Sequence, residues 1–141
     1  MTAHFDSTEQ TLVIIKPDGV QRKLVGRIIQ RFEDRGLTIK KMYQTMLEPK
    51  KVQEHYDHLK ERDFFPALID YMTSGPVVVI ILENKDVIQI VRSMIGATNP
   101  LSAAPGTIRG DFAVSTTENV IHASDSEEAA AVEIQRFFHE Q

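Results

Sequence analysis

Short β-branched or apolar runs alternate with amphipathic stretches along this chain of 141 residues. The first run, residues 11–15, is followed by Lys-Pro-Asp-Gly at residues 16–19, which predicts a strand and then a turn. Apolar positions recur at helical spacing over residues 24–32, and Gly36 is suited to end that helix. Looser alternation over residues 37–47 predicts a long strand with one solvated face.

The middle of the chain predicts three helices around a buried strand. One helix begins after Pro49, and a second covers residues 65–72, where the apolar positions again follow helical spacing. Residues 77–82 are apolar at every position, which is typical of a central strand that is buried on both faces. A third helix is expected over residues 87–95.

The last part of the chain is less regular. Asn84 or Asp86 can cap the third helix, and residues 97–110 form a long loop of the kind that is often functional. A short strand is expected over residues 119–121. The Ser-x-x-Glu pattern at residues 124–127 predicts a capping box at the start of the final helix.

The order of these elements gives the core pattern β-α-β-β-α-β. It predicts an α/β (α+β) fold of the ferredoxin-like, split βαβ type, with an antiparallel sheet and helices packed against one face. The polar residues 1–10 are expected to form a flexible N-terminal segment. Residues 11–141 then form a single domain, because no repeat, low-complexity tract or linker divides them.

Composition excludes several classes of protein. Apolar residues make up 42% of the chain and charged residues 26%, which is the balance of a soluble globular protein. The longest apolar run, residues 77–82, is too short to cross a bilayer, and the N-terminus lacks the pattern of a secretory signal. Without cysteine there is no disulfide framework and no thiolate metal site. We therefore expect a cytoplasmic protein.

The charge distribution points to an anionic ligand. The formal net charge of −4 argues against a nucleic-acid-binding protein that relies on bulk positive charge. Residues 87–110, however, contain no Asp or Glu but include Arg92 and Arg109. Such a segment suits an anion, although a loop that simply contains few acids would explain the same pattern equally well.

His122 is the first candidate for chemistry, because it follows a predicted strand end and precedes a predicted helix N-terminus. Unpaired backbone donors at that N-terminus would stabilise a phosphate near the imidazole. A neutral histidine can act as a covalent nucleophile. Glu133, about two and a half helical turns beyond Ser124, could hydrogen-bond the second ring nitrogen. Taken alone, a histidine at a strand end is more often a packing or surface residue.

Lys16, Arg92 and Arg109 are the candidates for holding an anion. Lys16 ends a buried strand at a turn, where ligands often bind, but a solvated lysine is the commoner interpretation. Surface exposure is likewise the default for Arg92. Arg109 lies between Gly106 and Gly110, where the backbone can approach a ligand closely. Glycine-rich phosphate loops and protein-kinase motifs are absent, so side chains would have to hold any nucleotide phosphates.

Two further patterns are weaker. His55-x-x-His58, with Asp57 and Asp63 nearby, could supply metal ligands, but a solvated helix face is favoured because no further ligand set is evident. One of the two phenylalanines at residues 64–65 must point outward, where it could stack on a base.

Five motifs in order resemble those of the nucleoside diphosphate kinase family, and together they span nearly the whole chain, residues 11–138. Residues 119–126, Asn-Val-Ile-His-Ala-Ser-Asp-Ser, look like the family pattern N-x-x-H-[GA]-S-D-S. The other four are Lys-Pro-Asp-Gly at 16–19, Ser-Gly-Pro-Val at 74–77, Gly-Ala-Thr-Asn-Pro at 96–100 and Pro-Gly-Thr-Ile-Arg-Gly-Asp-Phe at 105–112.

The resemblance implies a phosphotransferase that moves the γ-phosphate of a nucleoside triphosphate, mainly ATP, to nucleoside diphosphates by a ping-pong mechanism. His122 would be the phosphorylated nucleophile, oriented by Glu133 and Ser124. The implied nucleotide contacts are Lys16 and Asn119 to the ribose hydroxyls, Arg92, Thr98 and Arg109 to the phosphates, Tyr56 close to the transferred group, and Phe64 stacked on the base. The resemblance also implies Mg2+ carried by the nucleotide phosphates, with no protein metal site. It further implies a homo-oligomer, either a hexamer or a tetramer, with no membrane or specific nucleic-acid partner.

The chain departs from the family pattern at a few positions. Asp63 stands where many members have proline, which would loosen the turn into Phe64. Thr116 stands where some members place an apolar residue against the base, and Thr-Glu at residues 117–118 replaces a frequent Gly-Arg pair. The sequence ends at Gln141, before the C-terminal extension through which longer members contact their neighbours. Oligomer size and base preference are therefore left open.

Two other classes of function are weighed against the kinase. The same sheet topology serves RNA recognition, so a nucleic-acid or regulatory binding module is the main alternative. The acidic net charge and the lack of an aromatic RNP-type strand motif argue against it. A metal-dependent phosphohydrolase built on the histidines at positions 55 and 58 would need a carboxylate-rich pocket that the sequence does not suggest.

Overall fold

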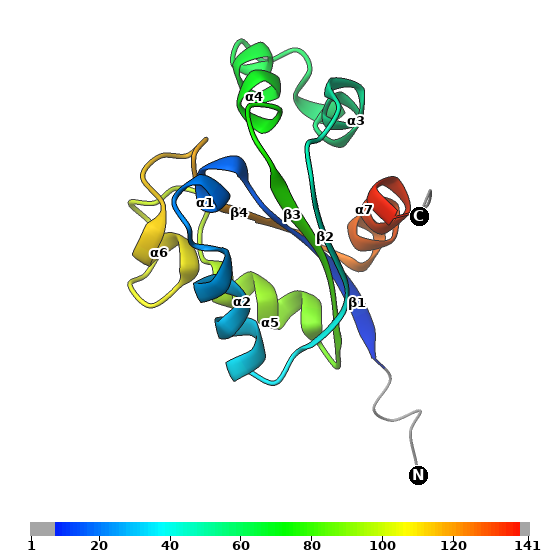
Figure 1. Cartoon of the computed structure of the whole chain (residues 1–141), viewed down its shortest axis with the longest axis vertical. Helices are drawn as coiled ribbons and strands as arrows, with labels where there is room; N and C mark the ends of the chain where they lie inside the picture. The colour runs from blue at the N-terminus through cyan, green and yellow to red at the C-terminus, as the bar shows by residue number, and fades with distance from the viewer. Residues whose placement is uncertain (1–7, 139–141) are drawn as a thin grey trace.

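The computed structural model describes residues 8–138, whose arrangement is shown in Figure 1. In chain order the elements are β1 (Glu9–Ile15), α1 (Pro17–Gln21), α2 (Val25–Asp34), β2 (Thr38–Thr45), α3 (Pro49–His55), the 3-10 turn η2 (Asp57–Leu59), α4 (Phe65–Met72), β3 (Val77–Asn84), α5 (Val87–Ile95), α6 (Ile108–Phe112), β4 (Ile121–Ala123) and α7 (Glu127–Phe138). The predicted flexible segment extends too far, because β1 begins at Glu9; residues 1–7 lie outside the described part. Among the described helices, none is long and apolar enough to span a membrane.

The strands form one antiparallel sheet in the order β2-β3-β1-β4, which confirms the predicted split βαβ topology. In space β3 lies between β1 and β2, although it follows both in sequence. Its pairing with β1 runs from Glu9 opposite Asn84 to Ile15 opposite Val78. The short strand β4 pairs with the other edge of β1 and is itself an edge of the sheet.

Helices cover both faces of this sheet, so the prediction of helices on one face is wrong. Val13 and Ile15 of β1 pack with α2 and α5, whereas Leu12 and Ile14 pack with α3, α4 and α7. Figure 1 shows α2 and α5 on one side of the sheet and α7 on the other. The reason lies in the uninterrupted apolar run at residues 77–82, because its alternate side chains supply an apolar set to each face.

The N-terminus of α5 is satisfied by a side chain from another element. Asp86 occupies the N-cap position with a φ of 56°, but its side chain makes no capping hydrogen bond. The Glu9 carboxylate instead accepts a hydrogen bond from the Ile88 N–H at 3.0 Å. The predicted cap is therefore replaced by a contact between β1 and α5, which the local sequence does not reveal.

The predicted capping box at the start of α7 is also wrong. The helix begins at Glu127, and the Ser126 hydroxyl accepts a hydrogen bond from the Ala129 N–H at 3.0 Å. Ser126 is thus the residue that caps the helix. Ser124, two residues earlier, is fully buried and makes a different contact, described below.

The strand that carries His122 begins two residues later than predicted, so the histidine lies at its centre and not beyond its end. A tight turn causes the shift. The Ile121 N–H donates to the Asn119 carbonyl at 2.8 Å, and Val120 between them has a φ of 76°. A positive φ is rare for a β-branched residue, and such strain clusters at functional sites.

Candidate active site

A chain of hydrogen bonds that begins in β1 holds His122. The Leu12 N–H donates to Ser124 Oγ at 3.1 Å, and the Ser124 hydroxyl donates to Glu133 Oε1 at 2.7 Å. The same carboxylate oxygen lies 3.0 Å from His122 Nε2. The predicted hydrogen bond between Glu133 and the ring is confirmed, and Ser124 acts on the ring through the carboxylate.

The carboxylate determines which nitrogen of His122 carries the proton. Burial alone would raise the pKa of Glu133, but hydrogen bonds from His122 and Ser124 outweigh it and lower that pKa. An ionised carboxylate can only accept, so His122 Nε2 donates and Nδ1 keeps its lone pair. Burial lowers the pKa of His122, and the charges of Lys16 and Arg109 lower it further against the pull of the carboxylate. The ring is therefore neutral near pH 7, and it remains reachable with 20% of its side-chain surface exposed.

Two arginines bind the outer edge of β4 on either side of His122. Arg109 Nη2 donates to the Ile121 carbonyl at 2.7 Å, and Arg92 Nη1 donates to the Ala123 carbonyl at 3.3 Å. No strand pairs with this edge of β4 within the described sheet, so the arginines take the place of a neighbouring strand. Both guanidinium groups are thereby held next to the histidine.

The loop that carries Arg109 is closed on itself. Thr107 caps α6, because its hydroxyl accepts from the Gly110 N–H at 2.9 Å. A Cβ at Gly110 would collide with the Ala104 carbonyl, so glycine is required for this closure. Arg109 Nη1 also donates to the Gly96 carbonyl at 3.0 Å. Gly110 is therefore required for the packing of the loop.

Two buried polar groups at the site have no hydrogen-bond partner among the described residues: Arg109 Nε and the Tyr56 hydroxyl. Burial, with a contribution from Arg92, lowers the pKa of Arg109 to about 10, so the guanidinium is still charged at neutral pH. Burial raises the pKa of Tyr56, so its hydroxyl keeps its proton and can donate. Buried donors without partners are rare in folded proteins. Two of them at one site fit an anionic ligand.

Lys16 is buried, contrary to the solvated lysine that is the commoner interpretation of its sequence position. Its Nζ donates to Asn119 Oδ1 at 2.7 Å, and Asn119 Nδ2 donates to the Thr98 carbonyl at 3.4 Å. Burial and then the charge of Arg109 lower the pKa of Lys16 to about 7. A lysine that is only partly charged in the resting site would gain charge when an anion binds beside it.

His55 also points into the site, so the predicted solvated helix face is wrong for this residue. It is 7% exposed, and its ring lies edge-on to the His122 ring with the centroids 4.6 Å apart. His58 is exposed on η2, so the two histidines of the His-x-x-His pattern do not face a common site. The signal in the sequence is the spacing of three residues from Val52, which places His55 toward the apolar side of α3.

His55, His122 and Glu133 lie close enough to be considered as metal ligands, since one donor atom from each falls within 4.8 Å of the others. The hydrogen bonds argue against this use. Arg136 Nη1 donates to His55 Nδ1 at 3.1 Å, and the carboxylate oxygen already accepts from two side chains. A cation would have to displace these bonds and sit among a lysine and several arginines. The geometry favours a neutral nucleophile over a metal centre.

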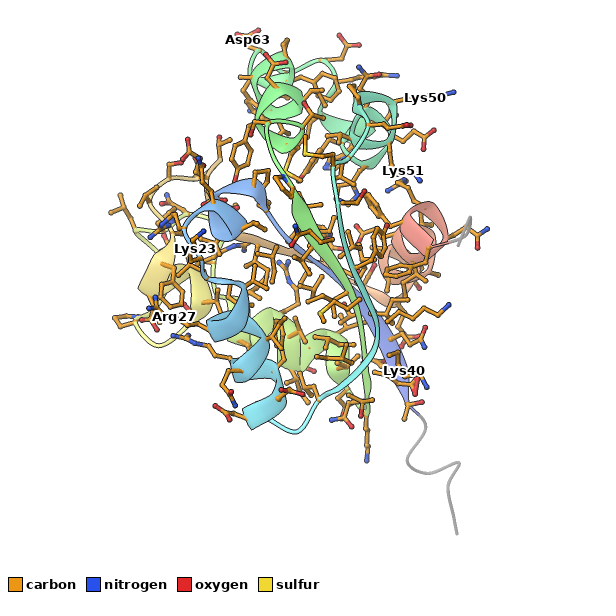
Figure 2. All side chains as sticks on the ribbon, viewed as in Figure 1. Lys23, Arg27, Lys40, Lys50, Lys51 and Asp63 are labelled. Atoms are coloured by element: carbon orange, nitrogen blue, oxygen red, sulfur yellow. The ribbon has the colours of Figure 1, made fainter. Side chains whose placement is uncertain are left out.

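Phe64 makes no described contact with the other predicted site residues. It is 43% exposed at the N-cap of α4, and the Arg62 guanidinium lies over its ring, 5.0 Å from the centroid. Figure 2 shows the neighbouring residue Asp63 at the outer end of the α3–α4 segment. The structure thus leaves much of the Phe64 ring accessible to a ligand, but no described contact joins it to His122.

A family model described as nucleoside diphosphate kinase matches residues 9–141. The chain belongs to the nucleoside diphosphate kinase family. A relative from Emericella nidulans with that name is 53% identical over 132 residues, which cover 94% of this chain and 86% of the relative. Another from Acetivibrio thermocellus is 54% identical over 132 residues, covering 94% and 97%. A crystal structure of nucleoside diphosphate kinase from Encephalitozoon cuniculi superposes with a TM-score of 0.90 at 42% identity, covering 92% of this chain and 88% of that one.

Membership in the nucleoside diphosphate kinase family confirms the resemblance drawn from the motifs. It makes the chain an enzyme of nucleotide metabolism and disfavours the alternative of a nucleic-acid or regulatory binding module. The fold prediction is confirmed by the same comparison, since solved nucleoside diphosphate kinase structures superpose on this chain with a TM-score of 0.90.

Proposed function

We propose that this chain transfers the γ-phosphate of a nucleoside triphosphate, mainly ATP, to nucleoside diphosphates through a phosphohistidine at His122. The supporting observation is the protonation pattern of the ring. Nε2 donates to an ionised Glu133, which leaves Nδ1 of a neutral imidazole as the free nucleophile. The guanidinium groups of Arg92 and Arg109, bound to the same strand, supply positive charge for a phosphate.

The reaction is a ping-pong cycle of two displacements. In the first, the Nδ1 lone pair of His122 attacks the γ-phosphorus and forms the N–P bond, while the bond from phosphorus to the bridging oxygen breaks. The electron pair of that bond leaves with the nucleoside diphosphate. In the second, a terminal phosphate oxygen of the acceptor attacks the phosphorus, the N–P bond breaks and its electron pair returns to Nδ1. The Nε2 proton stays on the ring throughout, hydrogen-bonded to Glu133.

The side chains around His122 would stabilise the charges that are present or develop during the transfer. The imidazole becomes positive as Nδ1 bonds to phosphorus, and the Glu133 carboxylate stabilises that charge. We assign Arg92, Thr98 and Arg109 to the nucleotide phosphates and Tyr56 to the neighbourhood of the transferred group. The buried donors without partners on Arg109 and Tyr56 support this assignment.

The remaining contacts concern the nucleoside. We assign Lys16 and Asn119 to the ribose hydroxyls, because their buried pair lies next to the phosphate-binding cations. Phe64 would stack on the base, and its exposed ring supports this role. Stacking on a π face would tolerate different bases, which suits an enzyme that accepts several nucleoside diphosphates.

The substrate would be the magnesium complex of the nucleotide. Around His122 the charged groups are mainly cationic, and the one carboxylate bonded to the ring is engaged by two hydrogen bonds. Such a donor set does not form a protein cage for a hard cation. Mg2+ would therefore be held by the phosphates, where it neutralises part of their charge.

We also propose a homo-oligomer, either a hexamer or a tetramer. Met42 on the edge strand β2 is 48% exposed, Met46 just after the strand is 54% exposed, and Leu101 on a loop is 95% exposed. An open strand edge with apolar side chains is suited to a second copy of the chain. Size-exclusion chromatography with light scattering tests this, and a monomer at assay concentrations would contradict it.

A labelling experiment tests the mechanism. Brief exposure to γ-labelled ATP with magnesium should leave label on the protein that is acid-labile, alkali-stable and removed by GDP. The label should be absent in His122→Gln and present in His58→Gln, a matched control at an exposed histidine. Full transfer activity in His122→Gln would overturn the proposal.

A further inference from the structure

Arg136 reaches the active site from α7, although no proposed nucleotide contact uses it. Its Nη1 donates to His55 Nδ1 at 3.1 Å. The His55 ring packs edge-on against three others, with centroid distances of 4.6 Å to His122, 4.6 Å to Tyr56 and 5.3 Å to Phe137. A single intervening ring therefore connects Arg136 to the nucleophile.

Burial is the main reason that His55 is neutral. It lowers the pKa of His55 to about 2. Electrostatic interactions with His122, Arg136, Lys16 and His58 lower it further. Because burial is the largest cause, the ring would stay neutral near pH 7 even without Arg136. The arginine therefore determines where the proton of the ring lies, not whether the ring is charged.

A guanidinium group can only donate hydrogen bonds. The bond from Arg136 requires a lone pair on His55 Nδ1, so the single proton of the neutral ring must lie on Nε2. Without that donor, the proton could occupy either nitrogen. The other described contacts of the ring are aromatic edges, which constrain its rotation less than a charge-assisted hydrogen bond does.

The orientation of His55 matters because His122 has few restraints of its own. One hydrogen bond, from Nε2 to Glu133, holds one side of the nucleophilic ring. The edge-on His55 ring, at an interplanar angle of 84°, supplies a second restraint. Phosphoryl transfer depends on in-line positioning, and a displacement of about 1 Å can lower a rate about 100-fold.

We propose that Arg136 is a positioning residue for the nucleophile: it fixes the proton and the orientation of His55, and through that ring the orientation of His122. The expected effect on rate rests on the proposed phosphohistidine mechanism. The position of the His55 proton does not, because it belongs to the resting enzyme and is measurable without substrate.

Substitutions at Arg136 separate its donor function from its size. Arg136→Met keeps a long side chain but removes the donor, whereas Arg136→Lys remains a donor only. Arg27→Met is the matched control, since Arg27 is exposed on α2, on the opposite side of the sheet from α7 (Figure 2). NMR spectra of the histidine ring nitrogens show which nitrogen carries the proton, and the His55 signals are identified by their loss in His55→Phe. In the wild type and in Arg136→Lys, the His55 proton should lie on Nε2. Arg136→Met should show both positions.

The rate measurement tests the consequence. In single-turnover labelling, His122 of Arg136→Met should be phosphorylated about 10- to 100-fold more slowly, and the nucleotide concentration that gives half the maximal rate should be unchanged. Arg136→Lys should retain most of the rate, and Arg27→Met all of it. In a His55→Phe background, Arg136→Met should cause no further loss, because no ring nitrogen is left for the arginine to orient.

Several results would overturn the proposal. One is an Arg136→Met enzyme with the wild-type rate and an unchanged His55 proton, and another is an equal loss of rate in the His55→Phe background. If thermal unfolding shows that Arg136→Met does not fold, the Arg136→Lys variant decides instead. A folded Arg136→Lys protein with the His55 proton on both nitrogens would also overturn the proposal. A wild-type enzyme that forms no phosphohistidine would refute the proposed mechanism instead, and the NMR result would still decide the role of Arg136.

Discussion

Replacing Glu133 with glutamine tests how His122 is activated. The substitution keeps the shape of the side chain and an oxygen that can accept from Ser124 and from the ring, at the wild-type distances of 2.7 and 3.0 Å. It removes the negative charge and replaces the second carboxylate oxygen with an NH2 group. A hydrogen bond to a charged group contributes about 1.5–3 kcal/mol, and one between neutral groups about 0.5–1.5 kcal/mol. The loss is thus about 1–1.5 kcal/mol, and it applies mainly to the transition state, in which the ring becomes positive.

This difference should lower kcat about 5- to 12-fold, because each 1.4 kcal/mol corresponds to about a factor of ten. The KM for nucleotide should stay unchanged, since Glu133 contacts the nucleophile and not the proposed phosphate ligands. The pH dependence of kcat should also shift in a definite direction. The Glu133 carboxylate raises the pKa of His122, so without it that pKa falls further. Activity is lost on protonation of the ring, so the acid limb of kcat should move to lower pH.

Steady-state transfer from ATP to GDP, measured from about pH 5 to pH 9, gives both quantities. Glu128→Gln is the matched control, because Glu128 is exposed on the same helix. An acid limb that moves to higher pH would refute the reasoning, since it would mean that the carboxylate does not stabilise the protonated ring. An unchanged kcat would refute the claim that the charge acts on the transition state.

Three other changes test other parts of the structure. In the unfolded chain His55 becomes protonated below about pH 6.5, whereas in the folded chain, where its pKa is about 2, it stays neutral. The free energy of unfolding should therefore fall by up to about 1.4 kcal/mol for each pH unit below that value. Urea titrations at several pH values should show a shallower decline in His55→Phe. Ser126→Ala should lower the free energy of unfolding by about 1 kcal/mol with kcat unchanged, and lost activity at normal stability would contradict its role as a cap. Asp63 is the second residue of a turn closed by the Phe65 N–H and the Arg62 carbonyl at 3.0 Å, a position that suits proline. Asp63→Pro should raise the melting temperature through about 0.4–1 kcal/mol of stability, and a lower value would mean that the turn requires a different φ.

The fold was predictable where one physical pattern dominates a segment. Continuous β-branched runs predicted β1 and β3, and apolar residues at helical spacing predicted α2, α4 and α5. The start of β4 was not predictable, because Val120 adopts a φ of 76° that nothing in a β-branched sequence favours. The cap of α5 was missed for a different reason: the acceptor, Glu9, lies 79 positions away in sequence from Ile88.

The site was predictable as far as its residues lie in recognisable motifs. His122, Lys16 and Asn119 belong to such motifs, and the structure brings the lysine and the asparagine into contact at 2.7 Å. The burial of His55 was not predictable in this way, because the sequence shows no further ligand set beside the His-x-x-His pattern and a solvated helix face is the ordinary expectation for it. Arg136 was missed altogether: it precedes two buried phenylalanines on α7, where a charged residue at the margin of an apolar stripe is ordinarily a solvated one.

The anchoring of the arginines explains how the site keeps its charges in place before substrate binds. Arg109 and Arg92 donate to the carbonyls of Ile121 and Ala123, the two residues that flank His122. The spacing between guanidinium and imidazole is therefore set by the strand and not by the loop that carries Arg109. Charges that are oriented in advance need no reorganisation in the transition state, which is when their stabilisation counts. Arg109 uses only one hydrogen bond from each Nη on the protein, so the other N–H groups of its fork could still donate to a phosphate, and its proposed function would depend on guanidinium geometry as well as on charge.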